Sequence, residues 1–425
     1  SGTREALPGA NHLVVDRNGG IWSAGFNRGL QRIQGQKSNV RRLVLSPGEA
    51  TANSTLDHKG ITAMVEDHRR QIWLGTRQQG IWKWNPGQQA LQQVGLPTQA
   101  KQNVKNLLLS QDGRYLWVFT QAKVMRLNIT ALSWEVVDPF LGKPGYSYYW
   151  SAAEWGGELL GSCFYQGIYK IDLKNPKNCH PYLPGEAQAK QAWGNLPLAS
   201  VSSMAADSNR QSIWLGTNYK GLYEWQAEKK QVVNHLKETR VNEILIAHNG
   251  LLWLGTTRGL QVYDPKTKTL LPNANWPAQR LKFVMGMTAD DQGLIWVADE
   301  KGIIAINADT RAIAHNFRAS EWLVNSQEWY SGFTSCLYTR QGSVWFANDN
   351  GLFVVDPETI TYDTVPPQVS LDEIRVGGKR QVLPDSSTVP LRFSYQENDL
   401  AFRLAVLHYK LPEKNQLFYK LRNFD

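Results

Sequence analysis

A phrase that recurs along the chain constrains its fold more than any other feature. The clearest copy runs from Ile61 to Asn85: an alternating apolar run ending in an acid, a polar turn, Ile-Trp-Leu-Gly-Thr, a second turn, and Gly-Ile before an aromatic strand. Eight copies can be counted, and all but the one near Leu159 contain the motif tryptophan. These tryptophans are Trp22, Trp73, Trp117, Trp214, Trp253, Trp296 and Trp345. Their mean spacing of about 46 residues is typical of propellers and solenoids.

Each copy has the pattern of a four-stranded antiparallel sheet. Ile61, Ala63 and Val65 alternate with more polar residues, which predicts a strand. Pairs such as Asn249-Gly250 follow the first strand in several copies, and glycine there supplies the positive φ of a tight hairpin. Four strands per repeat, arranged radially, form a β-propeller. The sequence therefore predicts an all-β propeller of seven or eight blades, with the motif tryptophans packed between neighbouring sheets.

The repeat pattern ends at Pro366-Pro367, which we interpret as a stiff hinge into a second domain. Beyond it, the alternation of apolar and other residues over 400–406 predicts a strand. An immunoglobulin-like sandwich has about seven strands in about 100 residues, whereas we count about five strands in the remaining stretch. We therefore predict a propeller over 1–362 and the start of a truncated immunoglobulin-like β-sandwich over 363–425.

Composition restricts the partners of the chain. It has 46 basic and 37 acidic residues and a net charge of +9, which weakly favours an anionic partner. No basic run suggests nucleic-acid binding, and no apolar run is long enough to span a membrane, so membrane attachment would need segments outside this sequence. Cys163, Cys179 and Cys336 give no disulfide framework or zinc signature. Cys163 and Cys179 could pair within one repeat or remain buried thiols.

No catalytic constellation emerges from the residue pattern. The eight histidines are scattered, without a His-Glu-x-x-His motif or a pair at ligand spacing. Asp67, Asp207 and Asp290 recur at the end of the first strand, where we interpret them as acids that close the first hairpin. We find no calcium-and-quinone pocket and no glycine-rich phosphate loop. The sequence therefore predicts no catalytic residues, no metal site and no cofactor.

Two sets of residues mark a candidate ligand-binding face. In a propeller, the joins between blades and the turns between second and third strands emerge on the same face, and long insertions on one face usually carry binding. Aromatic residues gather in two joins, where they either stack on sugars or peptides or cap the blades: Tyr148, Tyr149, Trp150, Trp322, Trp329 and Tyr330. Basic residues occupy the turns in six repeats: Arg28, Arg77, Lys123, Lys220, Arg258 and Lys301. These bases either form a broken ring that attracts anions or are ordinary solvated turn residues.

The repeat, from Ile61 to Asn85 and in its other copies, resembles the regulator propeller repeats of bacterial sensor proteins. The tail from Pro366 to Gly378, through 393–400 to 418–421, resembles the start of the triple-tyrosine (YYY) domain that follows such propellers. The resemblance covers about 13–425. It implies the periplasmic part of a membrane-spanning sensor, commonly a hybrid histidine kinase that senses oligosaccharides, or a protein ending in a diguanylate cyclase or a DNA-binding regulator. The family often carries two seven-bladed propellers in series, so the eighth repeat here is either an eighth blade or part of a neighbour.

The leading functional hypothesis is a periplasmic ligand-sensing domain with no enzymatic activity of its own. It would bind a small molecule, first of all an anionic oligosaccharide, and pass a conformational signal to an output module outside this sequence. The resemblance implies a homodimer in the full-length sensor. The alternatives are a propeller enzyme acting on glycans, such as a lyase or hydrolase, and a protein-docking scaffold. An enzyme would need acid, histidine and tyrosine side chains clustered near the propeller axis.

Overall fold

The structure is a computed structural model that describes residues 12–15, 21–25, 29–33, 39–45, 56, 60–97, 103–137, 148–164, 167–181, 201–226, 228–229, 231–272, 276, 281, 284–319, 335–348, 351–361, 368–381 and 392–407. The chain divides into two units. One is the continuous stretch 39–360, and the other combines 1–38 with 361–425. Each unit is described by itself below.

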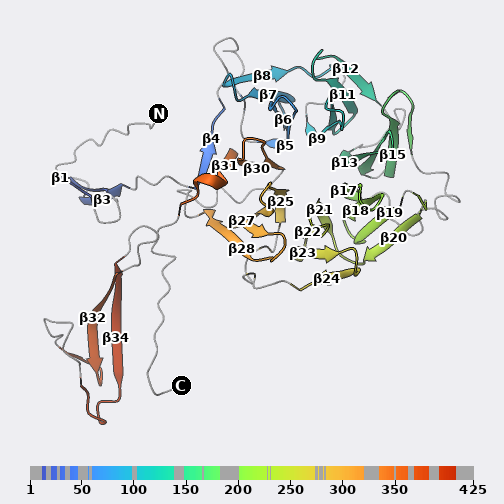
Figure 1. The fold of residues 1–425 in the computed structure, drawn as a ribbon. Coiled ribbons are helices and arrows are strands. Elements are labelled where there is room, and N and C mark those ends of the chain that lie inside the picture. Colours follow the sequence, from blue (N-terminus) through green and yellow to red (C-terminus); the bar gives the residue numbers. More distant parts are fainter. Residues whose placement is uncertain are drawn as a thin grey trace. The chain divides into compact units, whose positions relative to one another are not determined.

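Seven four-stranded antiparallel sheets form the described part of 39–360, and we number them as blades 1 to 7 (Figure 1). Blades 1 and 2 contain β5 (Ile61–Glu66), β6 (Ile72–Thr76), β7 (Ile81–Asn85), β8 (Ala90–Val94), β9 (Val104–Leu109), β10 (Tyr115–Thr120), β11 (Val124–Asn128) and β12 (Trp134–Val137). Blades 3 and 4 contain β13 (Tyr148–Trp155), β14 (Glu158–Phe164), β15 (Gly167–Asp172), β16 (Cys179–Pro181), β17 (Val201–Asp207), β18 (Ser212–Thr217), β19 (Leu222–Gln226) and β20 (Gln231–Leu236).

The remaining three blades follow in chain order, except for one strand. Blades 5 and 6 contain β21 (Val241–Ile246), β22 (Leu252–Thr256), β23 (Gly259–Asp264), β24 (Thr269–Leu271), β25 (Val284–Ala289), β26 (Leu294–Asp299), β27 (Gly302–Asn307) and β28 (Ile313–Arg318). Blade 7 contains β29 (Ser335–Tyr338), β30 (Val344–Asn348) and β31 (Gly351–Val355), and its outer strand is β4 (Val40–Leu43) from the opposite end of the unit. Helical structure in the described residues is limited to the 3-10 turn Pro357–Thr359 and to Ala319.

The seven blades close into a ring. The first strand of each blade contacts the first strand of the next, and β29 of blade 7 contacts β5 of blade 1. Each pair of neighbouring blades shares its own buried hydrophobic cluster in the described residues. The pairing of β31 with β4 completes blade 7 and therefore joins the two ends of the unit. The prediction of an all-β propeller is confirmed, and the described ring has seven blades.

The first copy of the repeat is not one of the seven blades. It forms a separate three-stranded sheet from β1 (His12–Val15), β2 (Ile21–Gly25) and β3 (Gly29–Ile33), within the other unit. Because β4 already occupies the edge of β31, the ring closes without an eighth blade. The compact unit accordingly runs over 39–360, whereas the sequence-based boundary was 1–362.

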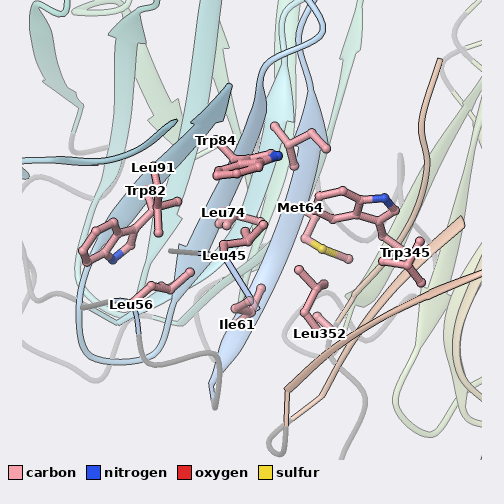
Figure 2. Close-up of a cluster of buried hydrophobic side chains, with 13 residues drawn as sticks. Leu45, Leu56, Ile61, Met64, Leu74, Trp82, Trp84, Leu91, Trp345 and Leu352 are labelled. Atoms are coloured by element: carbon pink, nitrogen blue, oxygen red, sulfur yellow. The ribbon is translucent and has the colours of Figure 1, made fainter. Parts of the chain in front are cut away.

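Six of the seven motif tryptophans lie between blades, as predicted, whereas the side chain of Trp22 lies outside the described residues. The side chains of Trp73, Trp117, Trp214, Trp253 and Trp296 have no exposed surface, and Trp345 is buried as well. Figure 2 shows the cluster at the closure, where Trp345 of blade 7 lies beside Met64 of blade 1. Large flat rings bury much apolar area in a single contact. The recurring tryptophan is thus core material of the ring.

The recurring acid has a second role that the pattern did not predict. In blades 1, 4 and 6, the indole Nε1–H of the motif tryptophan donates to the carboxylate at the end of the first strand, at 2.9, 3.2 and 2.7 Å. The acceptors are Asp67, Asp207 and Asp290. The same carboxylates also accept hydrogen bonds from backbone N–H groups of the hairpin, as predicted. One side chain therefore closes the hairpin and fixes the orientation of the tryptophan.

A second three-stranded sheet follows the propeller in the chain, with the order β33 (Lys379–Gln381), β32 (Gln368–Val376) and β34 (Leu400–Leu407). Its cross-strand pairs place apolar residues opposite each other, such as Leu371 with Leu404 and Ile374 with Phe402. One face of the sheet is therefore apolar, as the alternation over 400–406 predicts. Its assignment to a YYY domain remains a prediction. The described part of the chain contains no helix that could span a membrane.

Candidate functional site

The turns between second and third strands lie at one end of the ring, together with the joins between blades, and we call this end the join face. Consecutive strands of a blade run in opposite directions, so successive turns lie at opposite ends of the blade. The turn between the second and third strands and the join after the fourth strand therefore lie at the same end. Five such turns are described: 77–80, 121–123, 218–221, 257–258 and 300–301. Each carries one base: Arg77, Lys123, Lys220, Arg258 and Lys301. Glu300 is the one acid in these five turns, so the described part of the face carries an excess of positive charge.

The threonine that ends the motif Ile-Trp-Leu-Gly-Thr shapes these turns. The Oγ1 of Thr217 donates to the carbonyl of Gly221 at 2.9 Å and accepts from the N–H of Lys220 at 3.0 Å. Thr76, Thr120 and Thr256 make the same pair of contacts in their blades. The turn must close tightly, since Gly221 has a φ of +98° and a Cβ there would clash with the carbonyl oxygen of Leu236. The motif threonine therefore holds the turn that carries the base in four of the five described turns, whereas in blade 6 the carboxylate of Asp299 accepts from the N–H of Lys301.

A recurring backbone hydrogen bond brings these turns toward the axis of the ring. The residue after the motif threonine donates its N–H to the carbonyl of the residue that precedes the first strand of the same blade. The bond is 2.8 Å from Arg77 to Gly60, 3.2 Å from Gln121 to Asn103 and 3.3 Å from Thr257 to Arg240. Because the first strands contact one another around the ring, the turns lie beside its inner edge. The bases of these three turns, Arg77, Lys123 and Arg258, are thus grouped near the axis.

Further polar residues join the bases on this face. Lys105, the second residue of β9, is partly buried; burial lowers the pKa of its amine, and the positive charge of Arg77 lowers it further. Arg240 donates from Nε to the Oδ1 of Asn242 at 2.7 Å. Tyr219, beside Lys220, is 69% exposed and offers a ring for stacking. Sequence reasoning missed Lys105, Arg240 and Tyr219, although Tyr219 stands in a turn that the repeat pattern already placed on this face.

The predicted aromatic site is wrong at Tyr149. This residue lies in β13, not in a join, and only 1% of its surface is exposed. Its ring packs edge-on against Tyr169, with centroids 5.4 Å apart, in the core between blades 2 and 3. Tyr149 is therefore a packing residue. Tyr148 and Trp150 also lie in β13, but their side chains are outside the described residues, as are Arg28, Trp322, Trp329 and Tyr330.

An acid, a histidine and a tyrosine do meet, but inside the core. His235 lies 2.7 Å from the hydroxyl of Tyr263 through Nδ1 and 3.1 Å from the carboxylate of Glu224 through Nε2. Burial opposes ionisation of Glu224, yet hydrogen bonds from His235 and Gln226 outweigh it and lower the pKa of that carboxyl to about 2. All three residues come from third and fourth strands at the junction of blades 4 and 5. Since the group is buried away from the axis, it functions as an inter-blade contact.

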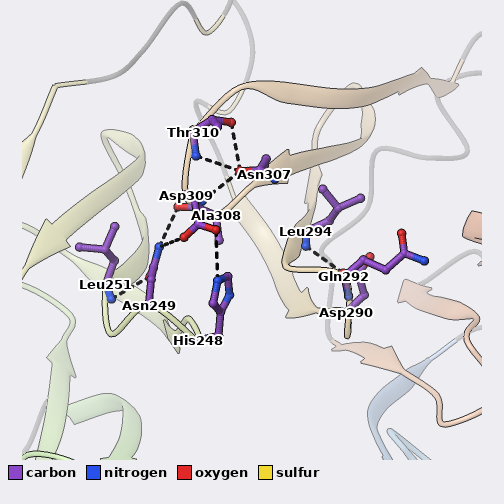
Figure 3. Close-up of polar contacts among 10 residues, drawn as sticks. All are labelled: His248, Asn249, Leu251, Asp290, Gln292, Leu294, Asn307, Ala308, Asp309 and Thr310. Carbon is purple, nitrogen blue, oxygen red and sulfur yellow. Dashed lines mark hydrogen bonds and ion pairs between the residues drawn. The ribbon is translucent and has the colours of Figure 1, made fainter.

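The opposite end of the ring carries the first hairpins and the turns between third and fourth strands, and we call it the hairpin face. Figure 3 shows His248 and Asn249 from the blade 5 hairpin directed at Asp309 in blade 6, at 3.3 and 3.0 Å. His68 of blade 1 likewise lies against Gly113 of the blade 2 hairpin. The contacts of His248 and Asn249 with Asp309 tie blade 5 to blade 6. Among the described residues, no group of histidine, cysteine, aspartate and glutamate side chains is arranged to hold a metal ion, and the three cysteines form no disulfide.

No family model matches the sequence, and no curated protein sequence matches it either. Solved structures do match. The extracellular domain of a B. thetaiotaomicron protein assigned as a hybrid two-component system aligns over 95% of this chain and 53% of its own length, with a TM-score of 0.70 and 19% identity. The extracellular domain of a one-component system from the same organism aligns over 94% of this chain and 54% of its own, with a TM-score of 0.61 and 16% identity.

A second kind of neighbour is a propeller enzyme. The structure of a streptogramin B lyase aligns over 74% of this chain and 96% of its own, with a TM-score of 0.55 and 15% identity. At such identities the likeness shows a common fold. The chain spans about half the length of the two sensor domains. These domains come from the class of protein that the repeat and the tail resemble, and the chain shares their fold.

Proposed function

We propose that this chain is the extracytoplasmic ligand-sensing domain of a membrane-bound signalling protein and that it binds an anionic small molecule, first of all an oligosaccharide, on the join face. The observation that carries the proposal is the base in every described turn of that face. In three of these turns a repeated backbone hydrogen bond holds the turn beside the first strand. The likeness to extracellular domains of two-component and one-component systems supports the sensing role. The repeat and tail support a periplasmic location.

A sensing domain must bind its ligand more tightly in one conformation than in another, and it need not cleave any bond of the ligand. Arginine and lysine form charge-assisted hydrogen bonds with carboxylate or sulfate oxygens, and an exposed ring such as that of Tyr219 adds stacking area. A ligand shifts a conformational equilibrium only if it binds one state more tightly than another. In the full-length protein, a homodimer by the family resemblance, that preference would pass to an output module such as a histidine kinase or a diguanylate cyclase.

Isothermal titration calorimetry with matched neutral and acidic oligosaccharides tests the proposal. We expect an acidic member to bind and the Arg77→Ala, Arg258→Ala double variant to weaken it at least tenfold at low salt. The control is Arg114→Ala, Lys266→Ala, which removes two exposed bases from the hairpin face and should leave the affinity within twofold. If the join-face variant binds as tightly as the wild type at both low and high salt, the bases of that face have no role.

The second candidate is a propeller enzyme that acts on glycans, a lyase or a hydrolase. The observation in its favour is the likeness to a streptogramin B lyase over nearly the whole length of that enzyme. Against it, the acid, histidine and tyrosine that meet in the described residues are buried at a blade junction. Incubation of the protein with any oligosaccharide that binds, followed by product analysis, separates the candidates, because a sensor returns its ligand unchanged.

A further inference from the structure

The join between blades 4 and 5 is the one join that the structure describes completely. It contains four residues, 237–240, and leads from β20 directly to β21. The turn of blade 4 lies against it, because a Cβ at Gly221 would lie 3.1 Å from the backbone nitrogen of Lys237. So short a join leaves little chain to cover the face. At this junction, the side chains that a ligand can reach are therefore identifiable.

Hydrogen bonds hold the two sides of the junction together. The Oγ of Ser202, in the first strand of blade 4, donates to the carbonyl of Val241 in blade 5 at 2.7 Å. The N–H of Thr257, in the turn of blade 5, donates to the carbonyl of Arg240 at 3.3 Å. Arg258 follows Thr257 directly, so the backbones of the two arginines lie side by side. Their long side chains can therefore converge on one anion.

The guanidinium of Arg240 is oriented and keeps most of its donors. Its Nε donates to the Oδ1 of Asn242 at 2.7 Å, in an exposed contact, and the side chain makes no other polar contact within the described residues. A guanidinium has five N–H donors, so the four on the two Nη atoms remain for a ligand. Two parallel hydrogen bonds from such donors to a carboxylate are among the strong hydrogen bonds of proteins. This guanidinium therefore suits a carboxylate ligand.

The bases of this junction have no acidic partner in the described part of the chain. Lys220, Arg240 and Arg258 are exposed, and none of them forms an ion pair there. Lys237 adds a fourth base in the join, and Glu238 is the one acid of the join and its two neighbouring turns. Four bases against one acid leave a positive surface, which attracts anions.

An exposed ring stands next to these charges. Tyr219 precedes Lys220 in the turn of blade 4 and is 69% exposed. An aromatic face offers apolar area to the C–H face of a sugar ring. Asn218, one position earlier, is only 6% exposed, yet its carboxamide has no hydrogen-bond partner among the residues that the structure describes. Buried polar groups without a partner are uncommon, and a ligand hydroxyl would supply one.

We infer that the junction of blades 4 and 5 is a uronate-binding subsite of the join face, where Tyr219 stacks on the sugar ring and Arg240, together with Arg258, binds its carboxylate. The inference rests on the proposed function and makes it specific. Asn218 and Asn242 bind hydroxyls of the same ring. The ligand class is an oligosaccharide that contains a uronic acid, because its charge and its ring lie on one sugar unit.

Three probes separate the contributions to this subsite: D-glucuronate carries a ring and a carboxylate, D-glucose carries the ring alone, and acetate carries the carboxylate alone. Binding to the full chain is followed by NMR through the ring signals of Tyr219, which are assigned by their loss in Tyr219→Ala. We expect D-glucuronate to shift these signals and to bind about tenfold more tightly than either other probe. D-glucose binding as tightly as D-glucuronate would overturn the inference, and so would Tyr219 signals that stay unchanged in D-glucuronate.

Matched variants, measured by isothermal titration calorimetry, test the two kinds of contact. Arg240→Gln should weaken D-glucuronate about tenfold, whereas Lys301→Gln, which removes one base from blade 6 on the same face, should change its affinity less than twofold. Tyr219→Ala should weaken it about threefold, whereas Tyr395→Ala, at a ring that is 87% exposed outside 39–360, should leave it unchanged. All four side chains are exposed, and thermal unfolding checks that each variant is folded. Equal effects within either pair would overturn the subsite.

The outcomes also separate this subsite from the sensing role. If an acidic oligosaccharide binds the wild type and binds Arg240→Gln equally well, the subsite is wrong and the proposed function stands. If no oligosaccharide binds but D-glucuronate shifts the Tyr219 signals as expected, the subsite stands and the oligosaccharide-sensing role fails. If an acidic oligosaccharide binds while the Tyr219 signals stay unchanged, the ligand is held elsewhere and the subsite is refuted.

Discussion

Asp67 concentrates three hydrogen bonds on one buried carboxylate, from the backbone N–H groups of Arg69 and Gln71 and from the indole of Trp73. Replacement by alanine would leave these donors without their acceptor, and the buried indole cannot turn to water. An unsatisfied buried donor costs about 1–3 kcal/mol. We therefore expect Asp67→Ala to lower the free energy of unfolding by about 3 kcal/mol, measured by urea denaturation. A change below about 1 kcal/mol would show that the carboxylate contributes little.

Blade 5 supplies the matched comparison. Ala247 occupies the position of the acid, and the Nε1 of Trp253 has no hydrogen-bond partner among the described residues. Ala247→Asp would restore the acceptor that blades 1, 4 and 6 possess. We expect it to raise the free energy of unfolding by about 1 kcal/mol, since burial of the carboxylate offsets part of the gain. If the substitution destabilises the protein instead, the backbone of blade 5 does not admit the shared geometry.

Glu243 predicts a pH dependence of stability. This residue of β21 accepts a hydrogen bond from the backbone N–H of Met287 at 3.2 Å, and burial raises the pKa of its carboxyl from the ordinary 4.5 to about 7. Its other titratable neighbour is the thiol of Cys336, whose pKa is raised by burial and by Glu243. Because the folded state holds the proton more tightly than the unfolded state, the free energy of unfolding falls as pH rises from about 4.5 to about 7.

The Glu243→Gln variant tests this dependence. Glutamine keeps an oxygen for Met287 but does not titrate, so the decline between pH 4.5 and 7 should flatten. Glu243 retains partial solvent access. We therefore expect the free energy of unfolding of the variant, relative to that of the wild type, to rise by about 2 kcal/mol between pH 4 and pH 8. Glu224, with a pKa of about 2, contributes in a lower pH range. Parallel stability curves for wild type and variant would contradict the assignment.

At the scale of single residues, sequence reasoning succeeds where a residue type has one use and fails where it has several. The motif tryptophans recur within apolar strands, and burial is the common outcome for such residues. Aromatic residues of 145–150 suit either an exposed loop or a core strand, and the periodicity of that copy is too weak to decide. Tyr149 is consequently misplaced by the pattern and buried in the structure. The tryptophans that bond to Asp67 and Asp290 lie six positions later in the sequence. This spacing recurs in the repeat, but the geometry of a hairpin alone did not indicate that the acid would accept a hydrogen bond from the indole.

At the scale of elements, the repeat predicts the strands but not the closure. Most blades are continuous in sequence, so one copy of the phrase predicts one blade. Blade 7 is the exception, because its fourth strand is Val-Arg-Arg-Leu at 40–43, which bears no motif. It pairs with β31 some 310 residues later in the chain, as Val40 pairs with Val355. Contacts of such sequence separation leave no local pattern, which is why counting repeats gave eight copies and could not decide between seven and eight blades.

Two truncations test the closure by β4. Removal of 1–38 keeps the strand, whereas removal of 1–45 also deletes it and exposes the edge of β31. Val40 and Leu45 are each 2% exposed, and their loss from the core should cost about 4 kcal/mol. The exposed ion pair of Arg41 with Asp356 adds little. We expect the shorter truncation to unfold at the same urea concentration as the wild type and the longer one to unfold at a lower concentration. The longer one should also self-associate through the open edge, which light scattering detects. Equal stability of the two would refute the closure.

At the scale of the whole molecule, the ring gives its two ends different tasks. The hairpin face is crossed by direct polar contacts between neighbouring blades, such as those from Asn249 to Asp309 and from Arg69 to Thr130. Four described turns of the join face are instead fixed within their own blades by threonine, and three of these also by the backbone bond to the first strand. The backbone of these turns is therefore held by groups other than the basic side chains.

This division leads to the last prediction, that a 39–360 fragment suffices for folding and for binding. All seven junctions between neighbouring blades, including the one that β4 completes, lie within this stretch, so the fragment should unfold in one cooperative transition in calorimetry. Arg77, Lys123, Lys220, Arg258 and Lys301 also lie within it. We therefore expect the fragment to bind an acidic oligosaccharide with an affinity within twofold of that of the full chain, measured by isothermal titration calorimetry. A fragment that folds cooperatively but binds at least tenfold more weakly would place essential ligand contacts in 1–38 or 361–425.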